Sequence, residues 1–174
     1  MLSRLIGVLV VFLLHACFTL VSQADDQDVD LLIRKHWDWT LSQSPVFAGQ
    51  LGDRSGDGKL PDVSINTIAS SRRVRGFLES AREIDPGSLT VNSRLNLDIF
   101  IRYLEDEVGE FDHKAYLVPI TNRWGFHIYF AELYKRLPFN NVDDYRSYLG
   151  RLAAFSDYAD QNMELLKQGI KEGY

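Results

Sequence analysis

Cysteine is almost absent from this chain. Among the 174 residues the one cysteine is Cys17, which lies within the first 24 residues. We predict that residues 1–24 are removed as a signal peptide, so that the mature chain begins at Asp25 and contains no thiol. Disulfide bonds, thiolate nucleophiles and cysteine metal ligands are then excluded. Export without disulfides is ordinary for a bacterial periplasmic protein and less usual for a small secreted eukaryotic domain.

The first 24 residues contain the three parts of a secretory signal. Arg4 supplies a basic start, Leu5–Leu14 forms an apolar core, and Ser22-Gln23-Ala24 places small residues before a cleavage point. We therefore expect a periplasmic or secreted protein with no stable membrane span after signal cleavage.

Two alternatives remain open for the same segment. If the apolar run is read on to Val21, it forms a marginal membrane anchor of about 17 residues. Leu14-His15-Ala16-Cys17 also resembles a lipobox, in which Cys17 would carry the lipid of an anchored lipoprotein. His15 fits that pattern poorly, so we favour the cleaved signal.

A basic stripe is missing too. Residues 1–24 contribute one of the 19 basic residues and none of the 24 acidic ones, so the mature chain has a formal net charge of −6. Nucleic-acid binding depends on Lys and Arg side chains that neutralise phosphates. The charge balance therefore argues against nucleic acid as a partner.

Local catalytic motifs are also missing. The sequence contains no HExxH helix, no Gly-x-Ser-x-Gly turn and no phosphate-binding loop. Among the mature histidines, His36, His113 and His127, no two are three or four residues apart, as two zinc ligands on one helix would be. We interpret His36 as a half-buried packing residue, His113 as a loop residue and His127 as a member of an aromatic group.

Several carboxylates share one predicted helix, and spacing alone does not distinguish an acid/base pair from a solvated face. We favour the solvated face for these residues: Asp98, Glu105, Asp106 and Glu107. The sequence therefore predicts no catalytic, cofactor-binding or metal-binding residue in this chain.

The loop from Asp53 to Leu60 partly matches a calcium-binding loop. Suitable residues occupy places 1, 3, 5, 6 and 8 of that motif: Asp53, Ser55, Asp57, Gly58 and Leu60. Place 12 is Ser64, which has no carboxylate, and Asp62 stands two residues too early. We favour a polar, glycine-rich turn, and calcium at Asp53–Asp57 remains the alternative.

The apolar periodicity predicts an all-α protein of five to six helices. The expected helices are residues 25–42, 45–51, 64–83, 90–108, 124–137 and 141–174. Glycine and proline separate them at 52–63 and 85–87, and Gly109 is expected to end the fourth helix. Residues 111–123 are expected to form an extended loop, with a short strand as the alternative.

The last predicted helix is strongly amphipathic. Its apolar residues recur every three or four positions: Tyr145, Tyr148, Leu152, Phe155, Ala159, Met163, Leu166 and Ile170. We expect Asn141 to cap its start and Gly173 its end. It is either one long helix or two nearly collinear ones with a break near Gly150 or Ser156, and we expect its stripe to pack on other helices.

Several short phrases, taken in order, resemble one family. They are SPVFA at 44–48, LGD at 51–53, LPDVS at 60–64, IDP at 84–86, NLDIF at 96–100, YLVPI at 116–120, YRSYLGRL at 145–152, DQ at 160–161 and GIKEGY at 169–174. Together they resemble the start of the bacterial family called domain of unknown function 885, over essentially the whole mature chain.

This resemblance implies the N-terminal helical part of a longer, mainly helical and often exported protein, similar to zinc metallopeptidases of the thermolysin-like clan. The family's zinc motif, of the His-Glu-x-x-x-Gly-His type, lies far downstream of the matched region, so none of its ligands has a counterpart here. We therefore expect residues 25–174 to be an incomplete helical domain without activity of its own. Zinc and a peptide substrate would belong to the missing half. The alternative is a free-standing periplasmic helical binding or interaction domain.

Overall fold

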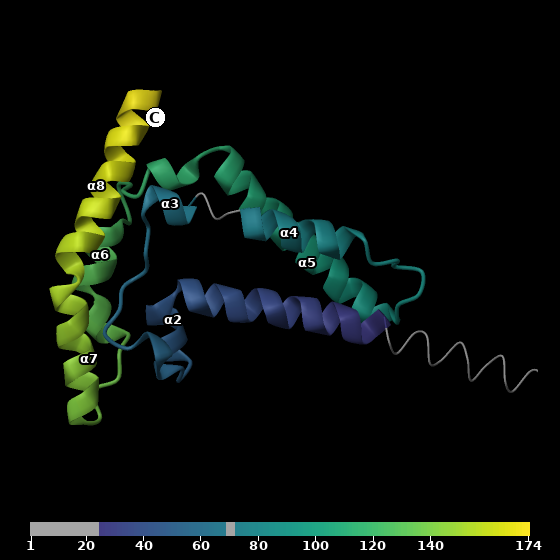
Figure 1. Cartoon of the computed structure of the whole chain (residues 1–174), viewed down its shortest axis with the longest axis horizontal. Coiled ribbons are helices and arrows are strands. Elements are labelled where there is room, and N and C mark those ends of the chain that lie inside the picture. Colours follow the sequence, from purple (N-terminus) through teal and green to yellow (C-terminus); the bar gives the residue numbers. More distant parts are fainter. Residues whose placement is uncertain (1–24, 69–71) are drawn as a thin grey trace, which may run out of the picture. The chain divides into compact units, whose positions relative to one another are not determined.

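The computed structural model describes residues 25–68 and 72–174, and these residues are mainly helical (Figure 1). No β-strand occurs in these two ranges, where one isolated antiparallel bridge joins Ile120 and Gly125. The prediction of an all-α fold is confirmed. Within the described part of the chain, every helix is too short or too polar to cross a bilayer. The predicted signal peptide, with its lipobox alternative at Cys17, lies outside the described residues.

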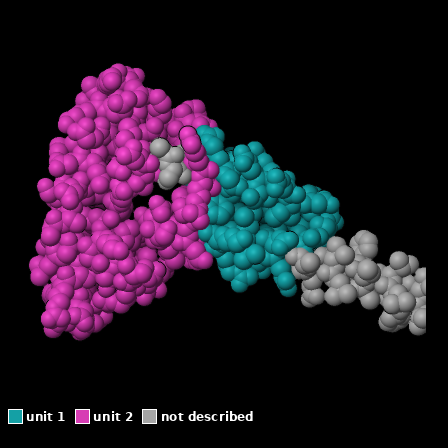
Figure 2. Space-filling view, in the orientation of Figure 1, with its two compact units in different colours: residues 1–36, 74–106 teal, residues 37–73, 107–174 magenta. Residues whose placement is uncertain are grey.

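The chain divides into two compact units (Figure 2). Unit 1 contains the described residues 25–36 and Val74–Asp106, from the helix at residues 25–43, α4 (Arg72–Arg82) and α5 (Val91–Asp112). Its buried apolar residues are Val29, Val74, Leu78, Ala81, Leu97, Phe100 and Leu104. Removing these side chains from water is the main force that holds unit 1 together.

His36 lies in the core of unit 1 and is only 5% exposed. Its ring packs edge-on against Phe77, Phe100 and Tyr103, with centroid separations of 5.1, 5.3 and 5.6 Å. The packing interpretation of His36 is confirmed, and the residue is buried more deeply than the half-buried position we expected.

The start of α5 follows the prediction, and its end does not. The backbone N–H of Ser93 donates to Thr90 Oγ1 at 3.4 Å, so Thr90 caps the start of α5. The helix then continues past Gly109 to Asp112, and the N–H of His113 still donates to the Gly109 carbonyl at 2.9 Å. One glycine inside a helix costs only about 1 kcal/mol, so Gly109 was too weak a signal for an end.

The predicted helix at residues 64–83 is described in two pieces, α3 (Ile65–Ile68) and α4. Residues 69–71 lie outside the described residues, so the continuity of this helix stays a prediction. Ser64 caps the first piece, where its Oγ accepts a 3.4 Å hydrogen bond from the N–H of Thr67.

Unit 2 contains the described residues 37–68, 72–73 and Glu107–Tyr174. Besides α3, its short elements are α2 (Pro45–Gln50), η1 (Arg54–Gly56), η3 (Ala115–Leu117), α6 (Phe126–Ala131) and η4 (Leu133–Lys135). The predicted second helix is confirmed as α2. The predicted helix at 124–137 is α6 followed by the 3₁₀ turn η4, and the expected loop at 111–123 contains the end of α5 and η3.

Two nearly collinear helices, α7 (Val142–Ala153) and α8 (Phe155–Glu172), form the C-terminal part of unit 2 (Figure 1). They meet at Ala154, between the two break points that we considered. Asn141 caps α7 as predicted, and Gly173 ends α8 in the left-handed conformation with φ of 87°.

The buried face of these helices is not the predicted stripe. The residues that α7 and α8 bury are Asp144, Ser147, Arg151, Asn162, Leu165 and Gly169. Several apolar residues are exposed: Tyr145, Leu149, Leu152, Met163 and Ile170. Most of them directly follow a buried residue, and one helical step turns by about 100°. The predicted packing of the stripe is therefore wrong for its exposed members, because the most buried face of each helix lies about 100° from the stripe. The other members, Tyr148, Phe155, Ala159 and Leu166, are half-buried, and Phe155 stacks on Phe130 of α6.

Candidate functional site

Helix α7 presents a polar face to the loop at residues 52–60. Asp144, Ser147 and Arg151 are spaced by three and four positions, so they lie on one side of the helix. All three are buried, and each has a partner in that loop. In the described chain no buried side-chain nitrogen or oxygen lacks a hydrogen-bond partner. This face therefore joins α7 to the loop through a complete polar network.

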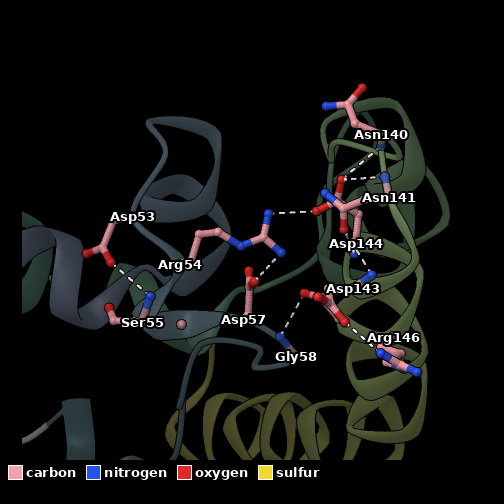
Figure 3. A network of polar contacts seen from close by, with 12 residues as sticks. Asp53, Arg54, Ser55, Asp57, Gly58, Asn140, Asn141, Asp143, Asp144 and Arg146 are labelled. Atoms are coloured by element: carbon pink, nitrogen blue, oxygen red, sulfur yellow. Dashed lines mark hydrogen bonds and ion pairs between the residues drawn. The ribbon is translucent and has the colours of Figure 1, made fainter.

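Asp144 connects the start of α7 to Arg54 (Figure 3). Its Oδ1 accepts a 2.6 Å hydrogen bond from Arg54 Nη1, and its Oδ2 accepts one of 2.8 Å from the backbone N–H of Asn140. The Asn141 side chain accepts from the N–H of Asp144 at 3.1 Å, which completes a capping box. The hydrogen bond from Arg54 is the main cause that lowers the pKa of the Asp144 carboxyl, so Asp144 is ionised at neutral pH.

Ser147 holds the loop at its closest approach to α7. The N–H of Gly58 donates to Ser147 Oγ at 3.0 Å. Gly58 has φ of 74°, and a Cβ built on Gly150 would lie 3.0 Å from the Cα of Gly58. The positive φ therefore favours glycine at position 58, and a side chain at position 150 would crowd the loop backbone where it crosses the helix.

Arg151 is the most enclosed cation of the network, with only 2% of its surface exposed. Its Nη1 donates to Ser147 Oγ at 2.6 Å, and its Nε donates to the Lys59 carbonyl at 3.2 Å. The carboxylate of Asp57 lies 3.6 Å from Nη2. Burial lowers the pKa of Arg151, but a guanidinium remains charged at physiological pH.

Asp57 lies between two arginines, which bears on the calcium alternative. Its Oδ2 is 2.6 Å from Arg54 Nη2, and its Oδ1 faces Arg151. Asp53 begins η1, where its Oδ1 accepts from the N–H of Ser55 at 2.9 Å (Figure 3). A cation at Asp57 would have to displace guanidinium groups, so these contacts support the favoured interpretation of a polar turn.

A polar hollow of about 460 Å³, here called the cationic pocket, adjoins this network. Four of its lining residues are basic and two are acidic: Arg54, Lys135, Arg136 and Arg151, with Asp57 and Asp144. The excess of basic side chains favours an anionic ligand there.

A second hollow of about 280 Å³ has five aromatic rings among its twelve lining residues, and we call it the aromatic cavity. The rings belong to Phe47, Phe126, Tyr129, Phe130 and Tyr158. Burial raises the pKa of the Tyr158 phenol, which is therefore neutral at physiological pH. Gln50 and Arg136 line both hollows, so the two adjoin. An apolar cavity with a few polar groups at its border is the usual form of a small-molecule site.

The other sequence candidates do not meet in this site. His127 is exposed and contacts the ring of Phe126, as its interpretation as a member of an aromatic group implies. On α5, Glu105 pairs with Arg82 at 2.7 Å and Asp106 faces Arg102 at 3.7 Å, which is typical of surface ion pairs. Among the residues that the structure describes, no three His, Cys, Asp or Glu side chains are grouped so that they could hold a metal ion.

Comparison with known families places the chain. The family described as "Bacterial protein of unknown function (DUF885)" matches residues 45–174. The chain belongs to this family. The DUF885 match begins with the first residue of α2 and contains the whole polar network of α7. No curated protein and no solved structure gives a significant match to the chain.

Sequence reasoning missed the network and both hollows of this DUF885 chain. The signal that could have found the network is the series Asp144, Ser147, Arg151, which occupies one side of a predicted helix. That series also fits a solvated face, and no local pattern distinguishes the two.

Proposed function

We propose that this chain is the non-catalytic, N-terminal helical part of an exported protein similar to zinc metallopeptidases. In this role its helices form a wall of the substrate cleft. Downstream residues of the longer protein would supply the zinc ligands and the general base, and the bound metal would supply an activated water for hydrolysis. By itself the chain hydrolyses no peptide bond.

The exposed apolar face of α7 and α8 carries this proposal. Leu149 is 62% exposed and Ile170 is 75% exposed, on the same face as Tyr145, Leu152 and Met163. Apolar residues gathered on one face mark a contact with another segment or chain. Downstream helices of a longer DUF885 protein are the partner that the family resemblance suggests, and they would cover this face.

Several side chains that could bind a metal already have partners within the chain, which is consistent with a non-catalytic role. His36 is enclosed by three rings, and Asp57 and Asp144 are bound to arginines. Each of these side chains would have to leave its present partners before it could bind zinc.

The direct test is a peptidase assay of the purified chain, with its zinc content measured by plasma mass spectrometry. We expect less than stoichiometric zinc and no hydrolysis of quenched fluorescent peptides. One zinc per chain, together with turnover that a chelator abolishes, would overturn the proposal. Sequencing the gene beyond codon 174 is a second test, and we expect an open frame that encodes a His-Glu-x-x-x-Gly-His helix.

Hydrogen exchange tests whether another segment normally covers the exposed apolar face of α8. If this face is normally covered, α8 should exchange faster in the isolated chain than α4, which exposes no large apolar side chain, because an uncovered helix opens more readily. The amides of α8 should slow when the downstream part is added. Equal protection of α8 and α4 in the isolated chain would favour a complete, free-standing domain.

That free-standing domain is the second candidate, and the two adjoining hollows favour it. It would be a periplasmic helical binding module whose ligand occupies the aromatic cavity. Export is part of both candidates. N-terminal sequencing of the mature protein should give Asp25 as the first residue, and palmitate labelling that depends on Cys17 would instead establish a lipoprotein.

A further inference from the structure

We propose that the aromatic cavity and the cationic pocket form one binding site for a carboxylate attached to a bulky apolar group. The apolar group would occupy the aromatic cavity, and the carboxylate would bind Arg136 at the border of the two hollows. Every lining residue belongs to unit 2.

The aromatic cavity selects the apolar part of the ligand. The rings of Phe126 and Tyr158 pack edge-on, with centroids 6.0 Å apart and an interplanar angle of 90°. An aromatic ligand could pack against them in the same edge-on geometry. Phe130 is held in place by stacking on Phe155 at 3.9 Å. A ligand ring or branched aliphatic group would therefore meet a wall that is already held by ring contacts at Phe126, Phe130 and Tyr158, which lowers the entropic cost of binding.

The charges at the border select the carboxylate. Arg54 and Arg151 are engaged by Asp57 and Asp144, and Lys135 pairs with Glu132 at 2.9 Å. The remaining basic residue that lines the cationic pocket is Arg136, which is the candidate ligand of the carboxylate.

Among the described residues Arg136 forms no ion pair. The hydrogen bond from Lys135 is the main cause that lowers the pKa of Glu132, and the charge of Arg136 adds to it from a longer range. The Arg136 guanidinium lies 5.0 Å from the centre of the Tyr129 ring, which orients the group and leaves its N–H donors for a ligand. A planar guanidinium binds a carboxylate through two parallel hydrogen bonds, so Arg136 suits a carboxylate better than a neutral amide.

Two sources can supply this chemistry: the C-terminal residue of a peptide, or a free apolar acid. N-acetyl-phenylalanine represents the first source and 3-phenylpropanoate the second. N-acetyl-phenylalaninamide has the same ring without the charge. Titration of each compound into the full chain, followed by calorimetry at low salt, measures the three affinities.

We expect N-acetyl-phenylalanine to bind about tenfold more tightly than its amide. Tighter binding of N-acetyl-phenylalanine than of phenylpropanoate would identify the peptide C-terminus as the source, because only the former carries a backbone amide. Equal affinities would identify a free apolar acid. Equal binding of the acid and the amide, or no binding of either acid at millimolar concentration, would overturn the proposal.

Two exposed residues allow variants that keep the fold, which circular dichroism would verify. Arg136→Gln should remove the preference for the acid and leave amide binding unchanged. Phe47→Ala should weaken the binding of the acid and of the amide equally, because Phe47 lines the aromatic cavity and not the cationic pocket. Arg146→Gln is the matched control, since Arg146 pairs with Asp143 and lines neither hollow. An acid preference that survives in Arg136→Gln would contradict the assignment.

This binding needs neither zinc nor residues beyond unit 2. Peptide hydrolysis by the chain would overturn its non-catalytic role and leave the site intact. Failure of the acids to bind would remove the site and leave that role untouched.

Discussion

Arg54 donates a 2.6 Å hydrogen bond to Asp144, which lies 90 positions later in the sequence. The two residues belong to different elements, η1 and α7, and their contact closes a long loop of chain. Asp144 is buried, whereas Arg54 is partly open to solvent. The pair therefore fixes the loop against the helix at the edge of the cationic pocket.

The pKa of Asp144 should depend on Arg54. In Arg54→Gln we expect the pKa of the Asp144 carboxyl to rise towards its ordinary value of 3.8, because the main cause of its depression is lost. NMR titration of the carboxyl carbons measures this change. Asp53 is the internal control, since its pKa is lowered mainly by the backbone N–H of Ser55 and should stay low.

The same carboxyl should make stability depend on pH. A folded pKa below the unfolded value adds stability that is present above that value and is lost as the pH falls through the folded pKa. The difference in unfolding free energy between the wild type and Asp144→Asn should therefore shrink as the pH falls below about 4. Urea unfolding at several pH values measures it, and a constant difference would contradict the role of ionised Asp144.

Removal of the buried cation should be costly. Arg151→Met deprives Ser147, Asp57 and the Lys59 carbonyl of a partner, and we expect a loss of about 3 kcal/mol. Arg146→Met, at an exposed position of the same helix, should change stability by less than about 0.5 kcal/mol. Urea unfolding of both variants measures the contrast, and equal losses would show that Arg151 has no special structural role.

Glycine 169 should tolerate no methyl group. A Cβ there would lie 2.8 Å from the Leu117 carbonyl oxygen, so Gly169→Ala should separate α8 from η3 and cost about 1–3 kcal/mol. Gly109→Ala is the control, because a Cβ on Gly109 meets nothing within 4 Å and alanine is the better helix former. That control should gain about 0.5–1 kcal/mol. Thermal unfolding compares the two, and a stable Gly169→Ala would contradict the close packing.

The exposed apolar face should accept charge. Leu149→Glu and Ile170→Glu should change the unfolding free energy by less than about 0.5 kcal/mol and should reduce self-association and binding of the dye ANS. Leu165→Glu is the contrast, because Leu165 is 3% exposed and an unpaired carboxylate there should unfold α8. Light scattering and ANS fluorescence measure the surface effect. If the two surface variants unfold the protein, the face is already covered.

The sequence predicts those features of the fold that depend only on neighbouring residues. Asn141 and Gly173 were recognised as caps because a cap depends on the few residues around it. The end of α5 was missed because Gly109 is tolerated inside the helix. The rotation of α7 could not be derived, since Arg151 is buried by a loop 92 positions earlier in the chain. The two hollows are harder still, because their walls come from separate elements.

One carboxylate performs two tasks at the start of α7. Asp144 completes the capping box of its own helix and also binds Arg54. Fraying of the first helical turn therefore removes one contact of η1, and detachment of η1 removes the counter-charge of Asp144. Ser147 and Arg151 still hold the loop further along α7. The local stability of the start of α7 is thus coupled to that of η1, on one side of the cationic pocket.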